Sequence, residues 1–120
     1  MDYKFINTEY LDSVSGGDSE TTREIIEMFK EQSVEIYNDM KSYYHAKNYK
    51  SLGLLAHKAK SSVAIMGMND LATMLKSFEL QAREGIEPEL YESYINRFKT
   101  ETDAAATELD DLVKNLPKIN

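Results

Sequence analysis

The sequence predicts an all-α protein, an antiparallel up-down-up-down four-helix bundle with a short extra N-terminal helix. Three observations support this fold class. Apolar residues recur every three or four positions in four successive segments, which is the spacing of one face of an α-helix. The five glycines and two prolines fall mostly where those segments should end. No stretch shows the apolar–polar alternation that is typical of a β-strand.

The first two helices are delimited by capping residues. Asn7 or Thr8 can cap a short first helix, which the glycine pair 16–17 ends. The apolar residues of this short helix are Tyr10, Leu11 and Val14. Asp18 is a good N-cap for a long second helix that runs to about His45. The spaced positions of the second helix are Ile25, Ile26, Phe29, Ser33, Ile36, Met40 and Tyr43 or Tyr44.

The third and fourth helices form a hairpin. A polar turn at 47–48 leads into the third helix, which Gly67 closes, and Asn69 can cap the fourth. A link this short forces the two helices to run antiparallel. The apolar stripe of the third helix is Leu52, Leu55, Ala56, Ala59, Val63 and Met66, with Ser62 at its edge. The facing stripe is Leu71, Met74, Leu75, Phe78 and Ala82.

The last helix begins after a glycine and a proline. Gly85 ends the fourth helix, and Pro88 suits the first turn of a long helix that runs down to Pro117. The apolar side of this helix is Tyr91, Ile95, Phe98, Thr102, Ala105, Leu109, Leu112 and Leu116.

Length and composition fit a single domain over residues 1–120, with 42% hydrophobic and 29% charged residues. The absence of cysteine excludes disulfides and thiol chemistry. No apolar run approaches the roughly 18 residues of a membrane span, and the start lacks a signal-peptide core. We therefore expect a cytoplasmic location and no membrane partner. The 21 acidic against 14 basic residues, a net charge of −7, argue against nucleic-acid binding.

Most enzymatic chemistries lack their residues. There is no glycine-rich phosphate loop, so ATP binding is not expected. His45 and His57 lie on different predicted helices and no Glu-x-x-His pair occurs, so neither a metal nor a cofactor is expected. Ser61 and Ser62 adjoin His57, but no oxyanion loop or buried carboxylate accompanies them as in a serine hydrolase.

His57 is the strongest candidate functional residue, because on a helical wheel it points away from the apolar stripe. Between Ala46 and Asn69 there is no acidic residue, while four lysines, Lys47, Lys50, Lys58 and Lys60, occur there. Such a region attracts an anionic ligand or an acidic partner. A neutral imidazole has one nitrogen with a free lone pair, which can attack phosphorus. Lys60, one turn along the helix, could neutralise a phosphoryl oxygen.

Small and apolar residues around the histidine suggest that another protein docks there. Small residues let a partner's active site close over the ring, and apolar residues off the core stripe would form a docking patch. The predicted docking residues are Gly53, Leu54, Lys58, Ser61, Ala64 and Ile65.

Residues 56–67, AHKAKSSVAIMG, resemble the signature of histidine-containing phosphotransfer (HPt) domains, an Ala-His-x-Leu-Lys-Gly-Ser-type run that ends in an apolar–glycine pair. The resemblance covers about residues 8–115. Residues 16–18, GGD, with Ile25, Ile26 and Phe29, are similar to the N-terminal pattern of the family. A second-helix pattern of the family is matched by Leu71, Leu75, Phe78, Glu79, Arg83 and Gly85.

This resemblance implies a four-helix bundle that carries a phosphoryl group between receiver domains in a His–Asp phosphorelay. It implies that His57 is phosphorylated, that Lys60 steadies the phosphoryl oxygens and that Glu79 can orient the histidine ring. The partners would be response-regulator receiver domains, including that of a hybrid sensor histidine kinase. The receiver would supply Mg²⁺, so the chain would be a phosphocarrier without a kinase domain rather than an autonomous enzyme. We expect a monomer, because His57 must stay reachable.

Two residues depart from the family pattern. Ser61 stands in place of the usual glycine and Ala59 in place of a larger apolar residue. Ser61 narrows the clearance near His57 and could offer a hydroxyl to the phosphoryl group, so the preference for particular receivers can differ. The alternatives are a docking or inhibitor module that binds receivers without phosphoryl transfer, and a purely structural bundle. For Glu79 the alternative is a solvated glutamate at a helix edge.

Overall fold

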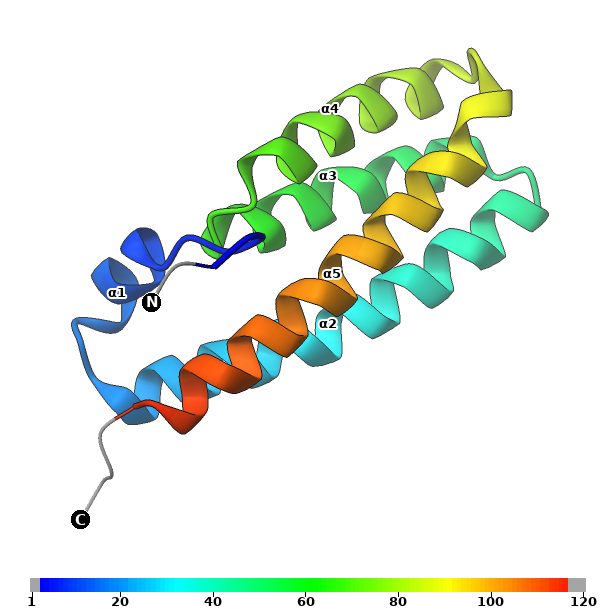
Figure 1. The fold of residues 1–120 in the computed structure, drawn as a ribbon. Helices are drawn as coiled ribbons and strands as arrows, with labels where there is room; N and C mark the ends of the chain where they lie inside the picture. The colour runs from blue at the N-terminus through cyan, green and yellow to red at the C-terminus, as the bar shows by residue number, and fades with distance from the viewer. Residues whose placement is uncertain (1–2, 117–120) are drawn as a thin grey trace.

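The structure is a computed structural model that describes residues 3–116. Within this range every regular element is helical, and four long helices run alternately up and down (Figure 1). The elements are α1 (Glu9–Ser15), α2 (Ser19–His45), α3 (Tyr49–Ile65), α4 (Asn69–Glu84), the 3₁₀ turn η1 (Pro88–Leu90) and α5 (Tyr91–Lys114). The predicted all-α four-helix bundle with a short N-terminal helix is confirmed.

The helix ends follow the capping rules at most positions. The Asp18 carboxylate accepts from Thr21 N at 2.9 Å and starts α2, as predicted. Gly16 and Gly85 end α1 and α4 in the left-handed conformation, at φ of 63° and 66°. Asn48 caps α3 by accepting from the backbone N–H at position 51.

Three boundary predictions need correction. Met68, with φ −84° and ψ 66°, occupies the N-cap position of α4, and Asn69 is already its first helical residue. Pro88 opens η1 rather than the first turn of α5. The last helix also ends earlier than the predicted end at Pro117, because α5 ends at Lys114 and Asn115 is its C-cap. The start of α1 agrees with the prediction, because Thr8 holds the N-cap position and Asn7 Oδ1 accepts from Glu9 N at 3.0 Å.

The predicted stripes of α2–α5 form the core. Most of their residues are buried, and the largest fully buried side chains include Tyr91, Phe78 and Phe98. Ile25, Leu55 and Leu112 are half-buried at the edge of the core. The short first helix buries one of its three large apolar residues, because Leu11 is 1% exposed whereas Tyr10 and Val14 are 53% and 49% exposed. Two apolar residues of α1 thus remain on the surface.

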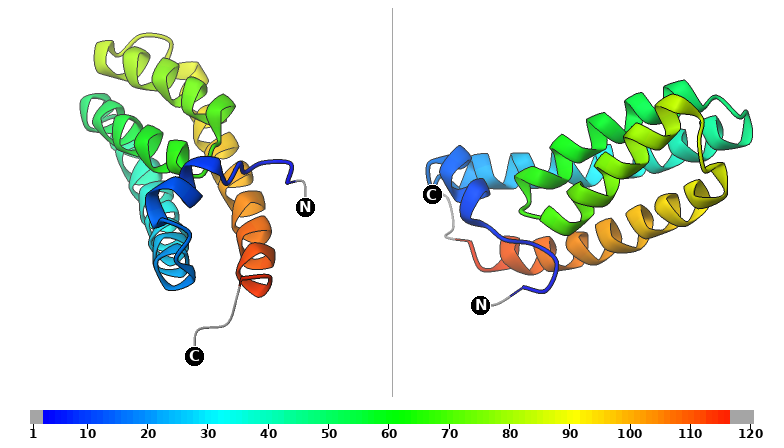
Figure 2. Two further views of the ribbon diagram at one scale, coloured as in Figure 1. Left: turned by 90° about the vertical axis from the view of Figure 1, so that its left-hand side faces the viewer. Right: turned by 90° about the horizontal axis from the view of Figure 1, so that it is seen from above.

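The helices differ in length, and this difference shapes one end of the bundle. α2 and α5 have 27 and 24 residues, whereas α3 and α4 have 17 and 16. The extra turns of α2 and α5 would leave their inner faces bare beyond the α3–α4 hairpin. Residues 3–8, which we call the strap, and α1 cover that end (Figure 2), where Ile6 and Leu11 are buried.

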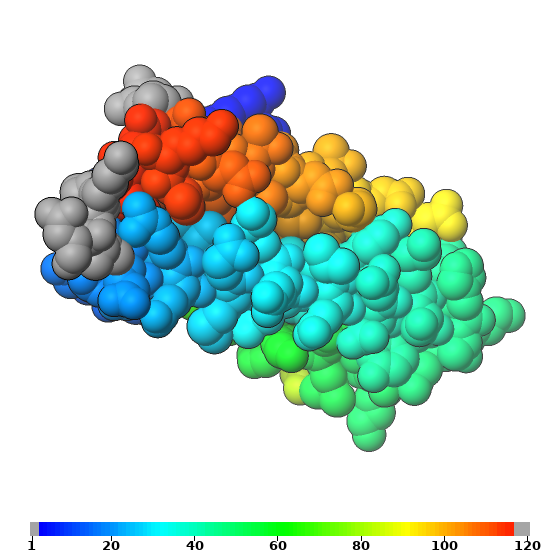
Figure 3. Space-filling view, turned by 90° about the horizontal axis from the view of Figure 1, so that it is seen from below, coloured from blue at the N-terminus to red at the C-terminus, as the bar shows by residue number. Residues whose placement is uncertain are grey.

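Seen from below, the molecule presents α2 and α5, which lie alongside each other (Figure 3). Lys30 of α2 donates to Asp110 of α5 at 2.6 Å across this face.

In the part of the chain that the structure describes, no helix is both long enough and apolar enough to cross a membrane.

Candidate functional site

His57 lies near the middle of α3, on the face turned away from the core. The buried face of α3 includes Leu52, Ala56 and Ala59, whereas the His57 side chain is 58% exposed. The helical wheel therefore predicted the direction of the ring correctly. A large partner can reach the imidazole without any movement of the bundle.

Glu79 of α4 lies beneath the histidine ring and holds it. Its Oε2 is 3.0 Å from His57 Nδ1, and its Oε1 accepts from Lys60 Nζ at 3.3 Å. The Glu79 side chain is only 6% exposed, so the alternative of a solvated helix-edge glutamate does not describe it. Arg83, one turn further along α4, places Nη1 3.4 Å from the same carboxylate. One buried carboxylate thus organises three cationic or ionisable side chains.

The carboxylate determines which ring nitrogen is available. An ionised carboxylate can only accept hydrogen bonds, so His57 Nδ1 carries the hydrogen that it donates to Glu79. The lone pair of the neutral ring is then on Nε2. No hydrogen bond joins Nε2 to another side chain among residues 3–116. Nε2 is therefore the ring nitrogen whose lone pair is free.

The environment also keeps Glu79 ionised. Burial by itself would raise the pKa of the Glu79 carboxyl. Hydrogen bonds from His57 and Lys60, together with the charges of these two groups, outweigh burial and hold the pKa of Glu79 below its usual value. Glu79 consequently stays an acceptor for Nδ1–H at neutral pH.

This lowered pKa predicts a specific pH dependence of stability. The unfolded chain binds a proton at Glu79 more readily than the folded chain does. The ionised carboxylate therefore stabilises the fold fully at pH values above its ordinary pKa of about 4.3. This stabilisation is lost as the pH falls through the lower pKa of Glu79 in the folded chain. The unfolding free energy of the wild type minus that of Glu79→Gln should become less positive as the pH falls from about 5 to about 3. Urea titrations of both proteins measure it. A difference that does not vary with pH would contradict the assignment.

Gly53 explains how α4 comes close enough for Glu79 to reach the ring. A Cβ atom at Gly53 would lie 3.0 Å from Arg83 Cγ, 3.1 Å from Arg83 N and 3.1 Å from Glu79 O. The missing side chain therefore lets α3 and α4 approach closely one turn before His57. Gly53 was predicted to lie on the docking surface. The structure instead buries it against α4, so it does not belong to the exposed surface around His57.

The other predicted docking residues lie on α3 around His57, and they differ in how far they are exposed. Leu54, Lys58, Ser61 and Ala64 are exposed, and Ile65 is half-buried. The local charge differs from the sequence expectation. α3 itself has no acidic residue, but α4 brings a carboxylate beneath its positive face, where it pairs with Lys60. The site therefore combines cations with one buried anion.

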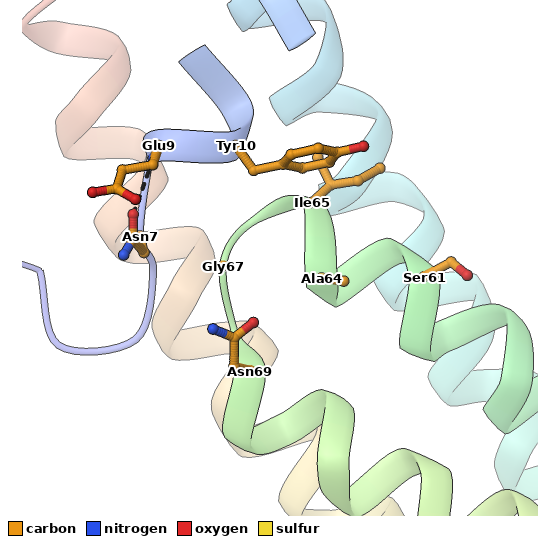
Figure 4. A pocket seen from close by; sticks show the side chains of 8 residues that line it. All are labelled: Asn7, Glu9, Tyr10, Ser61, Ala64, Ile65, Gly67 and Asn69. Atoms are coloured by element: carbon orange, nitrogen blue, oxygen red, sulfur yellow. Dashed lines mark hydrogen bonds between the residues drawn. The ribbon is translucent and has the colours of Figure 1, made fainter. Parts of the chain in front are cut away.

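A pocket of about 600 Å³ lies further along the same face of α3 (Figure 4). α3 contributes Ser61, Ala64 and Ile65 to it. Asn7, Glu9 and Tyr10 line the other side. The pocket is at the end of the bundle that α1 covers, so the surface next to the histidine is built by two segments distant in sequence.

Sequence reasoning missed two contributions to the site. Neither the packing role of Gly53 nor the pairing of Arg83 with Glu79 was predicted. The spacing of Glu79 and Arg83, four residues apart on one helix, is the available signal for the second. Among the described residues, no group of three or more His, Cys, Asp or Glu side chains is arranged to hold a metal ion.

Comparison with known families gives one match. The family model described as "Hpt domain" matches residues 24–117, most of the chain, including α3 and α4. Neither a search of curated proteins nor a search of solved structures found a match.

Proposed function

The chain belongs to the Hpt domain family, whose members transfer phosphoryl groups through a histidine in phosphorelays, and from this premise we propose that His57 is the phosphorylated residue. One observation carries the proposal. The His57 ring is exposed, and its Nδ1 is engaged by the buried Glu79, so that Nε2 is left for reaction. His45, the other histidine, has no carboxylate partner among the described side chains.

In the proposed reaction, Nε2 attacks the phosphorus of a phospho-aspartate on a receiver domain. The new N–P bond forms as the P–O bond to the aspartate breaks, and the electron pair of that bond returns to the aspartate carboxylate. The imidazole becomes cationic and keeps its hydrogen on Nδ1. Glu79 Oε2, 3.0 Å from Nδ1, stabilises that positive charge. Transfer to a second receiver is the reverse reaction at the same nitrogen.

Lys60 is suited to hold the transferred group. Its Nζ is 3.3 Å from Glu79 Oε1, and its side chain is 29% exposed, so it can turn from the carboxylate to a phosphoryl oxygen. Phosphoryl transfer requires in-line positioning and charge neutralisation more than covalent help from the protein. We assign Lys60 the neutralising role.

Lys60→Ala is expected to lower the rate constant for phosphoryl transfer to His57 by about ten- to a hundred-fold, because a positioned positive charge is lost from the transition state. Single-turnover transfer from a phosphorylated receiver measures this rate. Lys50→Ala, which removes an exposed lysine from the first turn of the same helix, is the control and should transfer normally. Equal losses in both variants would mean that Lys60 acts only through the overall charge of α3.

The partners in this proposal are receiver domains, and the receiver supplies Mg²⁺ and the aspartate. The chain contributes the nucleophile, the cation and the docking surface, and is a carrier rather than an enzyme that turns over alone. A monomer suits this role.

The proposal is tested by incubating the protein with a receiver domain charged from a small phosphodonor. We expect label to move to this chain as an acid-labile, base-stable phosphate, which is the behaviour of a phosphorus–nitrogen bond. Complexes without any transfer would instead support a docking or inhibitor module.

A further inference from the structure

The strap is held across the end of the bundle by one carboxylate of α5. Glu108 Oε2 accepts from Lys4 N at 2.9 Å, and Glu108 Oε1 accepts from Phe5 N at 2.9 Å and from Ile6 N at 3.0 Å. Three consecutive backbone amides therefore converge on a single side chain. Successive N–H groups around an anion give strong and geometrically specific binding.

The strap leads directly into α1 and fixes its position. Ile6 is buried, and Asn7 N donates to Met66 O at 2.9 Å, next to the α3–α4 turn. α1 starts two residues later, at Glu9. Since Tyr10 and Val14 of α1 are exposed, Leu11 is the only large apolar side chain that α1 buries. α1 therefore depends on the strap for its place in the molecule.

α1 in turn forms one wall of the pocket beside the histidine. Ser61 and Ala64 in the opposite wall share a face of α3 with His57. Ala64 is about 10 Å from His57 along the helix axis, at 1.5 Å per residue. A standard interface buries about 800 Å² on each partner, a patch of roughly 16 Å radius. A receiver centred on His57 would therefore cover this pocket and touch α1.

We propose that Glu108 is a positioning residue for partner docking. By holding the strap it keeps Tyr10, which is 53% exposed, in the surface that a receiver contacts, although Glu108 itself lies on α5. This inference rests on the proposed function, because it takes the receiver as the occupant of the surface. Without the Glu108 carboxylate the strap amides turn to water, and α1 is in its docked position for only part of the time. The apparent Kd then rises in inverse proportion to the docked fraction.

The test compares Glu108→Ala with Asp110→Ala, which removes a carboxylate of α5 that pairs with Lys30 instead of the strap. If the docked fraction falls to a tenth, KM and Kd for a phosphorylated receiver should rise about ten-fold in Glu108→Ala. Its kcat should stay within about two-fold. Direct labelling of His57 by phosphoramidate, which is too small to need the docking surface, should be unchanged. Hydrogen exchange at the amides of residues 4–6 should accelerate, and Asp110→Ala should match the wild type throughout.

A second variant keeps the proposal testable if Glu108→Ala folds poorly. Tyr10→Ala leaves the strap intact, and it should raise Kd for the receiver with normal amide exchange at residues 4–6. Faster exchange in Glu108→Ala with an unchanged Kd would overturn the proposal, as would an unchanged Kd in Tyr10→Ala. A lower rate of phosphoramidate labelling would show that Glu108 acts on the histidine rather than on docking. Binding of receivers without phosphoryl transfer in the wild type would refute the proposed function, and the Kd values would still decide the role of Glu108.

Discussion

Replacing His57 by Gln is expected to abolish phosphoryl transfer while leaving receiver binding nearly intact. Glutamine is polar and of similar reach, and its amide can still donate a hydrogen bond to Glu79 as His57 Nδ1 does. It lacks a nitrogen lone pair that can form a bond to phosphorus. Because the His57 side chain is 58% exposed, its replacement should not disturb the core. The label that moves from a charged receiver to the wild type should therefore be absent from His57→Gln.

The chain provides a matched control in His45→Gln. His45 is the only other histidine, and it is exposed at the last residue of α2. This variant should accept phosphate at the wild-type rate. Titration of a receiver with all three proteins should give Kd values within about two-fold of each other, since a surface substitution without loss of packing changes little. Label on His57→Gln, or its loss from His45→Gln, would place the phosphorylated residue elsewhere.

Gly67→Ala is expected to cause the largest loss of stability for the smallest change in side chain. Gly67 has φ +72°, a conformation that alanine adopts only under strain. Its Cβ would also lie 2.5 Å from Asn7 O and 2.9 Å from Asn7 N, which are backbone atoms of the strap. Backbone strain and overpacking together should lower the unfolding free energy by about 2–4 kcal/mol. Urea unfolding monitored by circular dichroism measures this change.

Gly85→Ala separates the two causes. Gly85 has φ +66°, but no atom lies within 4 Å of the position of its missing Cβ. This variant should show only the backbone strain, about 1–2 kcal/mol. The additional loss in Gly67→Ala then measures the displacement of the strap. Equal losses of unfolding free energy in the two variants would show that moving the strap away from position 67 does not destabilise the protein.

The helices and the direction of His57 could be predicted because local pattern determines them. Stripes at helical spacing, a cap at Asp18 and a glycine at position 85 are properties of neighbouring residues. The face of α3 that carries His57 follows from the same stripe. The role of Glu79 was anticipated only through family resemblance, because its burial depends on how closely α4 approaches α3.

The remainder depends on contacts between distant segments, which no local pattern contains. Gly53 was predicted to leave space for a partner beside the His57 ring, whereas its role in the structure is to let the backbone of α4 approach α3. The sequence pattern did not distinguish Leu11 from Tyr10 and Val14, whereas the structure buries only Leu11 among the large apolar residues of this seven-residue helix. Glu108 looks like any exposed acid of α5 until the strap is seen to lie beside it.

The pairing of Glu79 with Nδ1 also limits how receiver domains can exchange phosphoryl groups with the protein. Only one nitrogen of His57 is reachable, so in the proposed relay every donor and every acceptor must visit the same atom from the same side. Two receivers cannot occupy the protein together, and each must leave before the next arrives. A receiver that binds too tightly would block the relay as effectively as one that does not bind.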